Sequence, residues 1–134
     1  MYLLDTCIVS KLLKEDVKVC EHVGTIKPTQ LGISIITKLE INYGFELHPN
    51  RFQRQKQRWE QFYRNIHVIP FGDAEQEAAV ILRAYLTKKG TPIGGYDVLI
   101  AATALANKTI CVTNNTAEFN RVPKLILEDW TKLC

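Results

Sequence analysis

Short apolar runs alternate with longer segments of helical periodicity along this chain, and this alternation limits the fold more than any other feature. The apolar runs predict buried strands at residues 2–4, 31–35, 67–71, 109–113 and 125–127. The segments between them predict helices at residues 6–14, 16–23, 36–47, 51–64 and 73–89, with one more headed by Asp97. Strands that alternate with helices predict an α/β fold, a doubly wound sandwich whose central, mostly parallel sheet of four to five strands is flanked by helices.

Nothing in the sequence divides this pattern into parts. The chain has no internal repeat, low-complexity tract or linker, and its 134 residues are enough for one sizeable core. We therefore expect a single domain over residues 1–134. Within it, Asp73 and Gln76 have the spacing of a capping box at a helix start, and Gly90 fits the stop of the same helix.

Other features point to a protein of the cytoplasm. No apolar run reaches transmembrane length, and the first residues lack the basic leader of a secretory signal. The cysteines form no CxxC pair and no His/Cys cluster with zinc-like spacing. They are Cys7, Cys20, Cys111 and Cys134. We expect four reduced thiols, no structural metal, a cytoplasmic location and no membrane partner.

Asp97 heads a segment that is otherwise almost wholly apolar. Between Val98 and Ala106 only Thr103 carries a hydroxyl group, and no side chain carries a charge. A carboxylate at such a helix start is stabilised by the free amides and by the positive end of the helix dipole. Taken alone, the segment favours Asp97 as an N-cap or first-turn residue over a functional acid.

The expected topology brings other polar side chains to the same place as Asp97. Ligands of open parallel sheets bind beyond the carboxyl ends of the strands. Asp5 directly follows the first strand, and Asn115 follows the strand at residues 109–113. Because a helix that feeds a parallel strand runs antiparallel to it, the start of the Asp97 helix lies over that strand's carboxyl end. Asp5, Asp97 and Asn115 should therefore share one edge of the sheet.

Glu40 is a fourth candidate, on the helix expected at residues 36–47. On a helical wheel it falls on the same side as Ile36, Tyr43 and Leu47. A buried carboxylate costs several kcal/mol unless it is paired with a cation or takes up a proton. Glu40 is therefore expected to face a cation.

Two alternatives stay open for this helix. Glu40 could instead be a helix-edge acid paired with a nearby lysine. Ile41 and Phe45 lie on the opposite side, so the helix is apolar on two faces, and the second face could meet a partner subunit.

Three converging carboxylates repel one another, and a divalent ion would resolve that repulsion. Oxygen ligands alone suit Mg²⁺ or Mn²⁺, which keep several waters and bind substrate phosphates. Such an ion lowers the pKa of a bound water and neutralises charge that develops on a phosphodiester. The acids Asp5, Glu40 and Asp97 therefore point to a metal-dependent nuclease.

The positive charge of the chain is concentrated in one segment. The net charge is +3, and residues 51–64 hold five basic residues against one acid. Arg51, Arg54, Lys56 and Arg58 are the candidates for RNA binding. The aromatic residues of this segment could stack on bases, or they could belong to the core, because most of them fall at helical spacing. They are Phe52, Trp59, Phe62 and Tyr63.

Taken together, the motifs resemble those of PIN-domain ribonucleases and, within that group, VapC-type toxins of bacterial toxin–antitoxin pairs. They are YLLDT at residues 2–6, SIITKLEINYG at 34–44, PIGGYDVLIAA at 92–102 and VTNNTAEFNRVPKL at 112–125. Each motif is weak alone, but their order and spacing cover essentially the whole chain. The resemblance implies a single PIN-like domain.

The resemblance also implies the roles of individual residues. The acidic quartet of the family falls on Asp5, Glu40, Asp97 and Asn115, with the three acids as metal ligands. Three further residues are implied as supporting: Thr6 beside the Asp5 carboxylate, Thr113 at Asn115, and Glu118 one helical turn beyond Asn115. Asn115 is an accepted variant of the fourth acid. Cys7 departs from the asparagine that many relatives carry after Asp-Thr.

The activity implied is Mg²⁺- or Mn²⁺-dependent endonucleolytic hydrolysis of RNA, which inhibits translation and leaves a 5′-phosphate and a 3′-hydroxyl. Transfer RNA, and the initiator in particular, is favoured as the target by the IGGYD and TNNTAEF segments. The resemblance further implies a homodimer, and a cognate VapB-type antitoxin that neutralises the toxin by pushing a basic side chain toward the acids.

Three other functions stay open on the sequence. A degenerate PIN module that binds RNA or a protein without cleavage is supported by Cys7 and Asn115. A phosphoacceptor signalling domain would need an acceptor aspartate after the strand at residues 67–71, where Asp73 is better explained as a helix cap. A DNase would use the same metal site.

Overall fold

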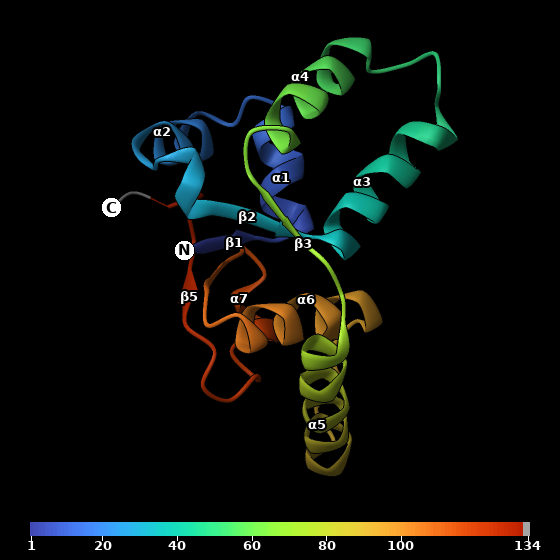
Figure 1. The fold of residues 1–134 in the computed structure, drawn as a ribbon, viewed down its shortest axis with the longest axis vertical. Coiled ribbons are helices and arrows are strands. Elements are labelled where there is room, and N and C mark those ends of the chain that lie inside the picture. The colour runs from blue at the N-terminus through green and yellow to red at the C-terminus, as the bar shows by residue number, and fades with distance from the viewer. Residues whose placement is uncertain (133–134) are drawn as a thin grey trace.

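The computed structural model describes residues 1–132 and places five short strands in one sheet whose neighbours all run parallel. The strands are β1 (Tyr2–Leu4), β2 (Leu31–Ser34), β3 (His67–Ile69), β4 (Ile110–Val112) and β5 (Leu127–Glu128). Their order across the sheet is β3-β2-β1-β4-β5, with β1 in the centre (Figure 1). The expected α/β class and parallel sheet are confirmed.

Helices cover both faces of this sheet. They are α1 (Thr6–Leu13), α2 (Val17–Thr25), α3 (Ile35–Leu47), α4 (Gln53–Tyr63), α5 (Asp73–Lys89), α6 (Gly95–Ala106) and α7 (Thr116–Phe119), with a 3₁₀ turn at Pro28–Gln30. Helices α1 to α4 lie on one side of the sheet and α5 to α7 on the other (Figure 1).

Each side of the sheet has its own apolar core. Successive side chains of a strand point to opposite faces, so Leu3 packs with α5, α6 and α7 whereas Leu4 packs with the α1–α4 layer. Trp59 of α4 and Trp130 near the carboxyl end are almost fully buried in the α1–α4 core, and Phe119 of α7 is buried in the other. The short strands are therefore buried on both faces, as is usual for a parallel sheet.

The strand order places a topological switch point in the middle of the sheet. From β1 the chain moves outward to β2 and β3, and it then returns to the other side of β1 to form β4 and β5. The direction of winding therefore reverses between β1 and β4, which pair from Tyr2↔Ile110 to Leu4↔Val112. The crevice beyond the carboxyl ends of two such strands is where open α/β sheets bind ligands.

The interpretation of the two faces of α3 is wrong in part. Ile41 and Phe45, expected to be free for a partner subunit, pack against the core that contains Trp59. Tyr43 and Leu47, expected to be buried, are 62% and 56% exposed. Because α3 carries apolar residues on most sides, periodicity could not tell which side meets the core, and the position of α4 decides it.

Two local boundaries also differ from the prediction. The N-cap of α5 is Gly72, whose amide donates to Glu75 Oε1 at 2.8 Å, so Asp73 is the first helical residue and the Asp73–Gln76 capping box is not formed. The last strand, expected at residues 125–127, is β5 at Leu127–Glu128. Gly90 ends α5 with a φ of 71°, the left-handed conformation that glycine adopts readily.

The thiols and the membrane prediction can be compared with the structure in part. Cys7, Cys20 and Cys111 are free cysteines, and Cys134 lies outside the described residues. Within residues 1–132, no helix is long and apolar enough to cross a membrane.

Candidate active site at the carboxyl edge of the sheet

Asp5 ends β1 and caps α1, so it belongs to the sheet edge and to a helix at once. Its Oδ1 accepts a hydrogen bond from the Ile8 amide at 2.9 Å, and the residue as a whole is only 2% exposed. Burial, helped by the negative charges of Glu40 and Asp129, raises the pKa of Asp5 to about 6. Asp5 is therefore a carboxylate held in an environment that disfavours its charge.

Thr113 links Asp5 to the end of β4. Its buried hydroxyl group hydrogen-bonds the Asp5 carboxylate and accepts from the Asn115 backbone amide at 2.9 Å. The Asn115 side chain in turn donates from Nδ2 to Glu118 Oε2 at 2.6 Å. Thr113 thus contacts the backbone of Asn115 and not its side chain, and the side-chain amide of Asn115 donates to the carboxylate of Glu118.

Asp97 is the third residue of α6, and Gly94 is the N-cap. Of the two positions named for Asp97, N-cap and first turn, the structure has the first turn. The pKa of Asp97 is raised to about 6, first by burial, then by a hydrogen bond to Glu118 and by the charges of Glu118, Asp5 and Glu40. The start of α6 is therefore joined through Asp97 to Glu118 of α7.

Glu40 reaches this edge from α3 and meets Thr6 of α1. The Thr6 hydroxyl donates to Glu40 Oε1 at 2.6 Å and lies 3.2 Å from the Thr37 hydroxyl oxygen. Thr6 was expected to orient Asp5, and its described side-chain bonds go to Glu40 and Thr37 instead. Among residues 1–132, both ion pairs use Glu15, so the alternative in which a lysine pairs with Glu40 is not realised.

The acids influence one another without forming a closed group of metal ligands. In the part of the chain that the structure describes, no three His, Cys, Asp or Glu side chains are arranged to hold an ion by themselves. Each acid is instead held by a protein donor or by a second carboxyl group. The assignment of Asp5, Glu40 and Asp97 as metal ligands therefore stays a prediction.

The charges of all three acids act on the thiol of Cys7. Partial burial raises the pKa of the Cys7 thiol, and the charges of Asp5, Asp97 and Glu40 raise it further. Cys7 is the second residue of α1, next to the switch point between β1 and β4. Hard oxygen donors with uncompensated negative charge are the chemistry that a divalent cation such as Mg²⁺ or Mn²⁺ favours, so the residues present fit such an ion.

One acid at this edge was not found from the sequence. Asp129 follows β5, and its charge acts on Asp5. Its Oδ1 accepts from the Thr131 amide at 2.9 Å. Because the last strand was expected to end at residue 127, Asp129 was not placed beyond a strand end, although the correct boundary would have placed it there.

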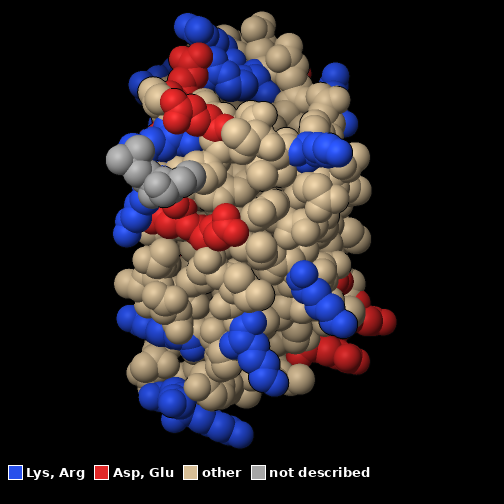
Figure 2. All heavy atoms as spheres, turned by 90° about the vertical axis from the view of Figure 1, so that its left-hand side faces the viewer, with Lys and Arg blue, Asp and Glu red and all other residues tan. Residues whose placement is uncertain are grey.

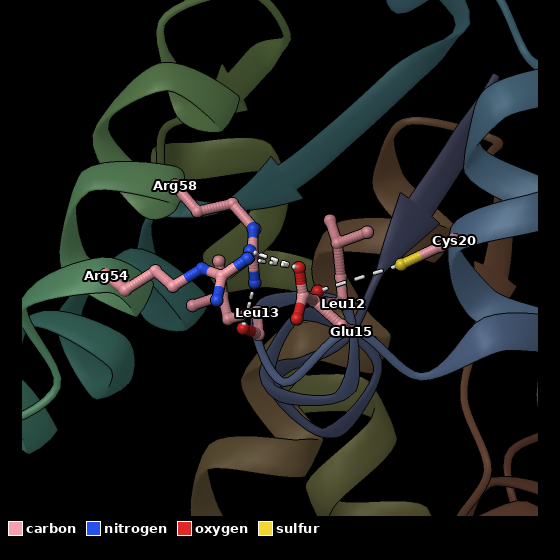
Figure 3. A network of polar contacts seen from close by, with 6 residues as sticks. All are labelled: Leu12, Leu13, Glu15, Cys20, Arg54 and Arg58. Carbon is pink, nitrogen blue, oxygen red and sulfur yellow. Dashed lines mark hydrogen bonds and ion pairs between the residues drawn. The ribbon is translucent and has the colours of Figure 1, made fainter.

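The basic segment is divided between internal and external roles (Figure 3). Arg58 donates from Nη1 to the Leu13 carbonyl oxygen at 2.6 Å and pairs with Glu15 at 2.6 Å, so it binds α4 to the end of α1. Arg54 approaches the same carboxylate at 3.4 Å with a side chain that is 81% exposed. Arg58 is thus an internal clamp, and Arg51, Arg54 and Lys56 stay candidates for RNA binding.

Most of the aromatic residues in this segment belong to the core. Trp59 is 1% exposed, and its Nε1 donates to Asn42 Oδ1 at 2.8 Å. Phe62 and Tyr63 pack against the same core, whereas Phe52 is 42% exposed. The alternative in which these rings form a base-stacking platform is therefore wrong for all but Phe52.

Comparison with known proteins assigns this arrangement to a group. The PIN domain family matches residues 2–125. The chain is 34% identical to a tRNA(fMet)-specific endonuclease VapC of Salmonella typhimurium, over 96% of this chain and 97% of that protein. It is 37% identical to ribonuclease VapC2 of Rickettsia felis, over 79% of this chain and 78% of that protein.

Solved structures agree with the sequence comparison. The chain superposes on VapBC2 from Rickettsia felis, bound to a DNA fragment from its promoter, with a TM-score of 0.88 at 31% identity, covering 96% of this chain and 98% of the other. It superposes on DNA-bound VapBC from Salmonella typhimurium with a TM-score of 0.85 at 32% identity, covering 96% and 97%.

Proposed function

We propose a function for this chain from the premise that it belongs to the PIN domain family, and within it to the VapC ribonucleases. It is an endoribonuclease, the toxin of a toxin–antitoxin pair. The observation that carries the proposal is that Asp5 and Asp97 lie at the β1/β4 switch point, where burial and neighbouring carboxylates, Glu40 among them, disfavour the charges of these two aspartates.

The residues that would hold the ion are Asp5, Glu40 and Asp97, with Asn115 at the fourth position. Bound Mg²⁺ or Mn²⁺ would supply a water of lowered pKa and neutralise charge on the scissile phosphodiester. Thr113 holds the Asp5 carboxylate and Thr6 holds that of Glu40. These contacts restrict the rotamers of both acids, which lowers the cost of ordering them for ligation.

Glu118 supports cleavage over a degenerate, non-cutting module. Asn115 lacks a charge, but its amide donates to Glu118 at 2.6 Å, and Glu118 hydrogen-bonds Asp97. A fourth carboxyl group is therefore present at this edge even though the fourth position is an asparagine. Cys7, the other departure from the family pattern, is exposed to solvent.

The substrate we infer is RNA, with transfer RNA and its initiator form favoured. This follows from the tRNA(fMet)-specific name of a relative that matches 96% of this chain. The exposed side chains of Arg51 and Arg54 offer positive charge for the phosphate backbone. Cleavage of such an RNA would inhibit translation, and a cytoplasmic location follows from that substrate.

Two protein partners belong to the proposal. Neighbouring structures are VapBC complexes, which supports a VapB-type antitoxin as the neutralising partner. For the homodimer, we infer that the second copy covers the face with a hollow of about 670 Å³ between α5 and α6. The lining of this hollow includes Val80, Arg83 and Tyr96. Val80 is 57% exposed and Tyr96 is 50% exposed, so this face carries apolar surface that a second copy would cover.

The test is cleavage of a total small-RNA pool by the wild-type protein and by Asp5→Asn, each with Mg²⁺, Mn²⁺ or EDTA. Asparagine is as good an N-cap as aspartate, so Asp5→Asn keeps the cap and removes the charge. Asp16→Asn is the matched control, because Asp16 caps α2 through the Val19 amide at 3.1 Å and lies away from the site.

Discrete cuts by wild type and Asp16→Asn with metal, absent with EDTA and absent for Asp5→Asn, would support the proposal. RNA that is bound but never cut, under any metal condition and by a folded protein free of antitoxin, would favour the binding module instead.

A further inference from the structure

A second hollow lies at the opposite edge of the sheet, beside the amino end of β4. It has a volume of about 590 Å³, within the range of sites for small molecules. Its lining comes from α5, the end of α6, the start of β4 and the segment before β5, and includes Ile81, Leu82, Tyr85, Leu105 and Ile126. The catalytic proposal makes no use of this groove, which we call the amino-edge groove.

The groove combines exposed apolar surface with positive charge. Ile81 is 72% exposed and Ile126 is 63% exposed, and both line the hollow, so a molecule bound in it would cover them. The charged side chains in its lining are Lys108 and Lys124, and no Asp or Glu of residues 1–132 is among the lining residues. Figure 2 shows this side of the molecule, with a largely uncharged lower half, Lys and Arg side chains spread over it, and acids at one margin.

The backbone fixes where the two lysines stand. Lys108 and Lys124 both adopt left-handed conformations, with φ of 54° and 66°. Lys108 follows the end of α6, where its amide donates to the Leu105 carbonyl oxygen at 3.3 Å. A third cation lies close by, because Lys89 Nζ stands 5.7 Å from the centre of the Tyr85 ring. Charge is therefore supplied from three separate segments around one apolar surface.

We propose that the amino-edge groove is a binding site for a small amphiphilic anion, a molecule with an apolar body and a carboxylate or similar head group. The apolar body would cover Ile81, Tyr85 and Ile126, and the head group would meet Lys108 and Lys124. A second copy of this chain is disfavoured here, because both charged side chains of the lining are lysines, and two copies meeting at this groove would bring like charges together.

The groove length sets the size of the apolar body. Its α5 lining runs from Ala78 to Tyr85, and the helical rise of about 1.5 Å per residue between these positions adds up to roughly 10 Å. Decanoate is a suitable probe for that length, with 1-decanol as the uncharged analogue and butyrate as the anion without a long apolar body.

Binding is measured by calorimetric titration of each probe into the wild-type protein and three variants. Ile81→Glu places a negative charge in the groove at an exposed position, and we expect it to weaken decanoate binding about tenfold or more. Lys108→Asn with Lys124→Asn removes the positive charges, and asparagine tolerates left-handed backbone. This pair should weaken decanoate several-fold and leave 1-decanol unchanged. Ala84→Glu is the matched control, because Ala84 is an exposed residue of α5 that lines neither hollow.

Decanoate that binds wild type and Ala84→Glu, and fails to bind Ile81→Glu, would support the site. The proposal is overturned if decanoate does not bind the wild type, or if Ile81→Glu and Ala84→Glu weaken its binding equally. It is also overturned if sedimentation shows that Ile81→Glu alone breaks a wild-type dimer, since the groove would then be an interface between copies. None of these results depends on RNA cleavage.

Discussion

At the scale of single residues, Asp5 combines a structural role with the catalytic role proposed for it. It caps α1 through the Ile8 amide, yet burial raises its pKa to about 6. The cap needs only an oxygen acceptor, whereas the charge is unfavourable in the metal-free fold. Asp97 shows the same conflict, because it hydrogen-bonds Glu118 and its pKa is likewise raised to about 6. Side chains whose ionised form is unfavourable in the fold are typical of functional sites.

This conflict predicts how the metal-free protein responds to pH. An unfolded aspartate has a pKa near 3.9, so between about pH 4 and pH 6 the folded state binds a proton that the unfolded state has lost. The free energy of unfolding should therefore fall as pH rises through that window, and the penalty is complete above about pH 6. For Asp5 alone it is on the order of 3 kcal/mol.

Asp5→Asn removes this penalty and keeps the cap. Without metal at pH 7 we expect its Tm to exceed that of wild type by roughly 6–15 °C, and the difference to vanish at or below about pH 4. Thermal melts in EDTA from pH 4 to pH 8 measure both effects. A variant less stable than wild type at pH 7 would mean that the charge of Asp5 serves the fold.

At the scale of elements, helix α4 is held by two side chains, one directed to the end of α1 and one to α3. Arg58 binds the last turn of α1 through the Leu13 carbonyl and Glu15, and Trp59 binds α3 through Asn42. A carbonyl at a helix end has no intrahelical partner, so the Arg58 guanidinium satisfies a group that the fold would otherwise leave to water.

Arg58→Ala should therefore destabilise the protein by about 1–3 kcal/mol, because it removes a charge-assisted hydrogen bond from a partly buried site. Arg54→Ala is the matched control: it faces the same Glu15 but is 81% exposed, so its ion pair contributes little. Urea denaturation of both variants measures the difference. Equal losses for the two arginines would contradict the assignment of Arg58 as the clamp.

The elements also show where sequence reasoning works and where it stops. The alternation of strands and helices was enough for the parallel sheet, and strand polarity alone brought Asp5, Asp97 and Asn115 to one edge, because both follow from chain order. The faces of α3 were misjudged because a helix that is apolar on most sides has no preferred side until α4 is in place. The contacts of Thr6 with Glu40 and of Asp97 with Glu118 join segments far apart in sequence, so no local pattern encodes them.

At the scale of the whole molecule, the two edges of the sheet differ in chemistry. The carboxyl edge gathers acids between β1 and β4, and the amino edge carries an apolar groove with lysines. Helix α5 lies between the two hollows of the lower layer, with Val80 in one and Ile81 in the other. Substitutions at these neighbouring residues therefore test the proposed dimer face and the proposed ligand groove separately.

Val80→Glu should break the proposed homodimer, because it places a charge in the apolar face that the second copy covers. We expect sedimentation velocity to show monomer at concentrations where wild type and Ile81→Glu are dimeric. A dimer that survives Val80→Glu would move the interface to another face of the molecule.

The central claim is that Asp5, Glu40 and Asp97 are held for a divalent cation, and Mn²⁺ binding tests it most directly. Mn²⁺ would be titrated into metal-free wild type, Asp5→Asn and the control Asp16→Asn at pH 7.5 and pH 5.5, with free Mn²⁺ measured by electron paramagnetic resonance. We predict binding by wild type and Asp16→Asn that weakens at pH 5.5, where protons compete for carboxylates of pKa about 6, and little binding by Asp5→Asn. Equal affinity in all three proteins at both pH values would contradict the account.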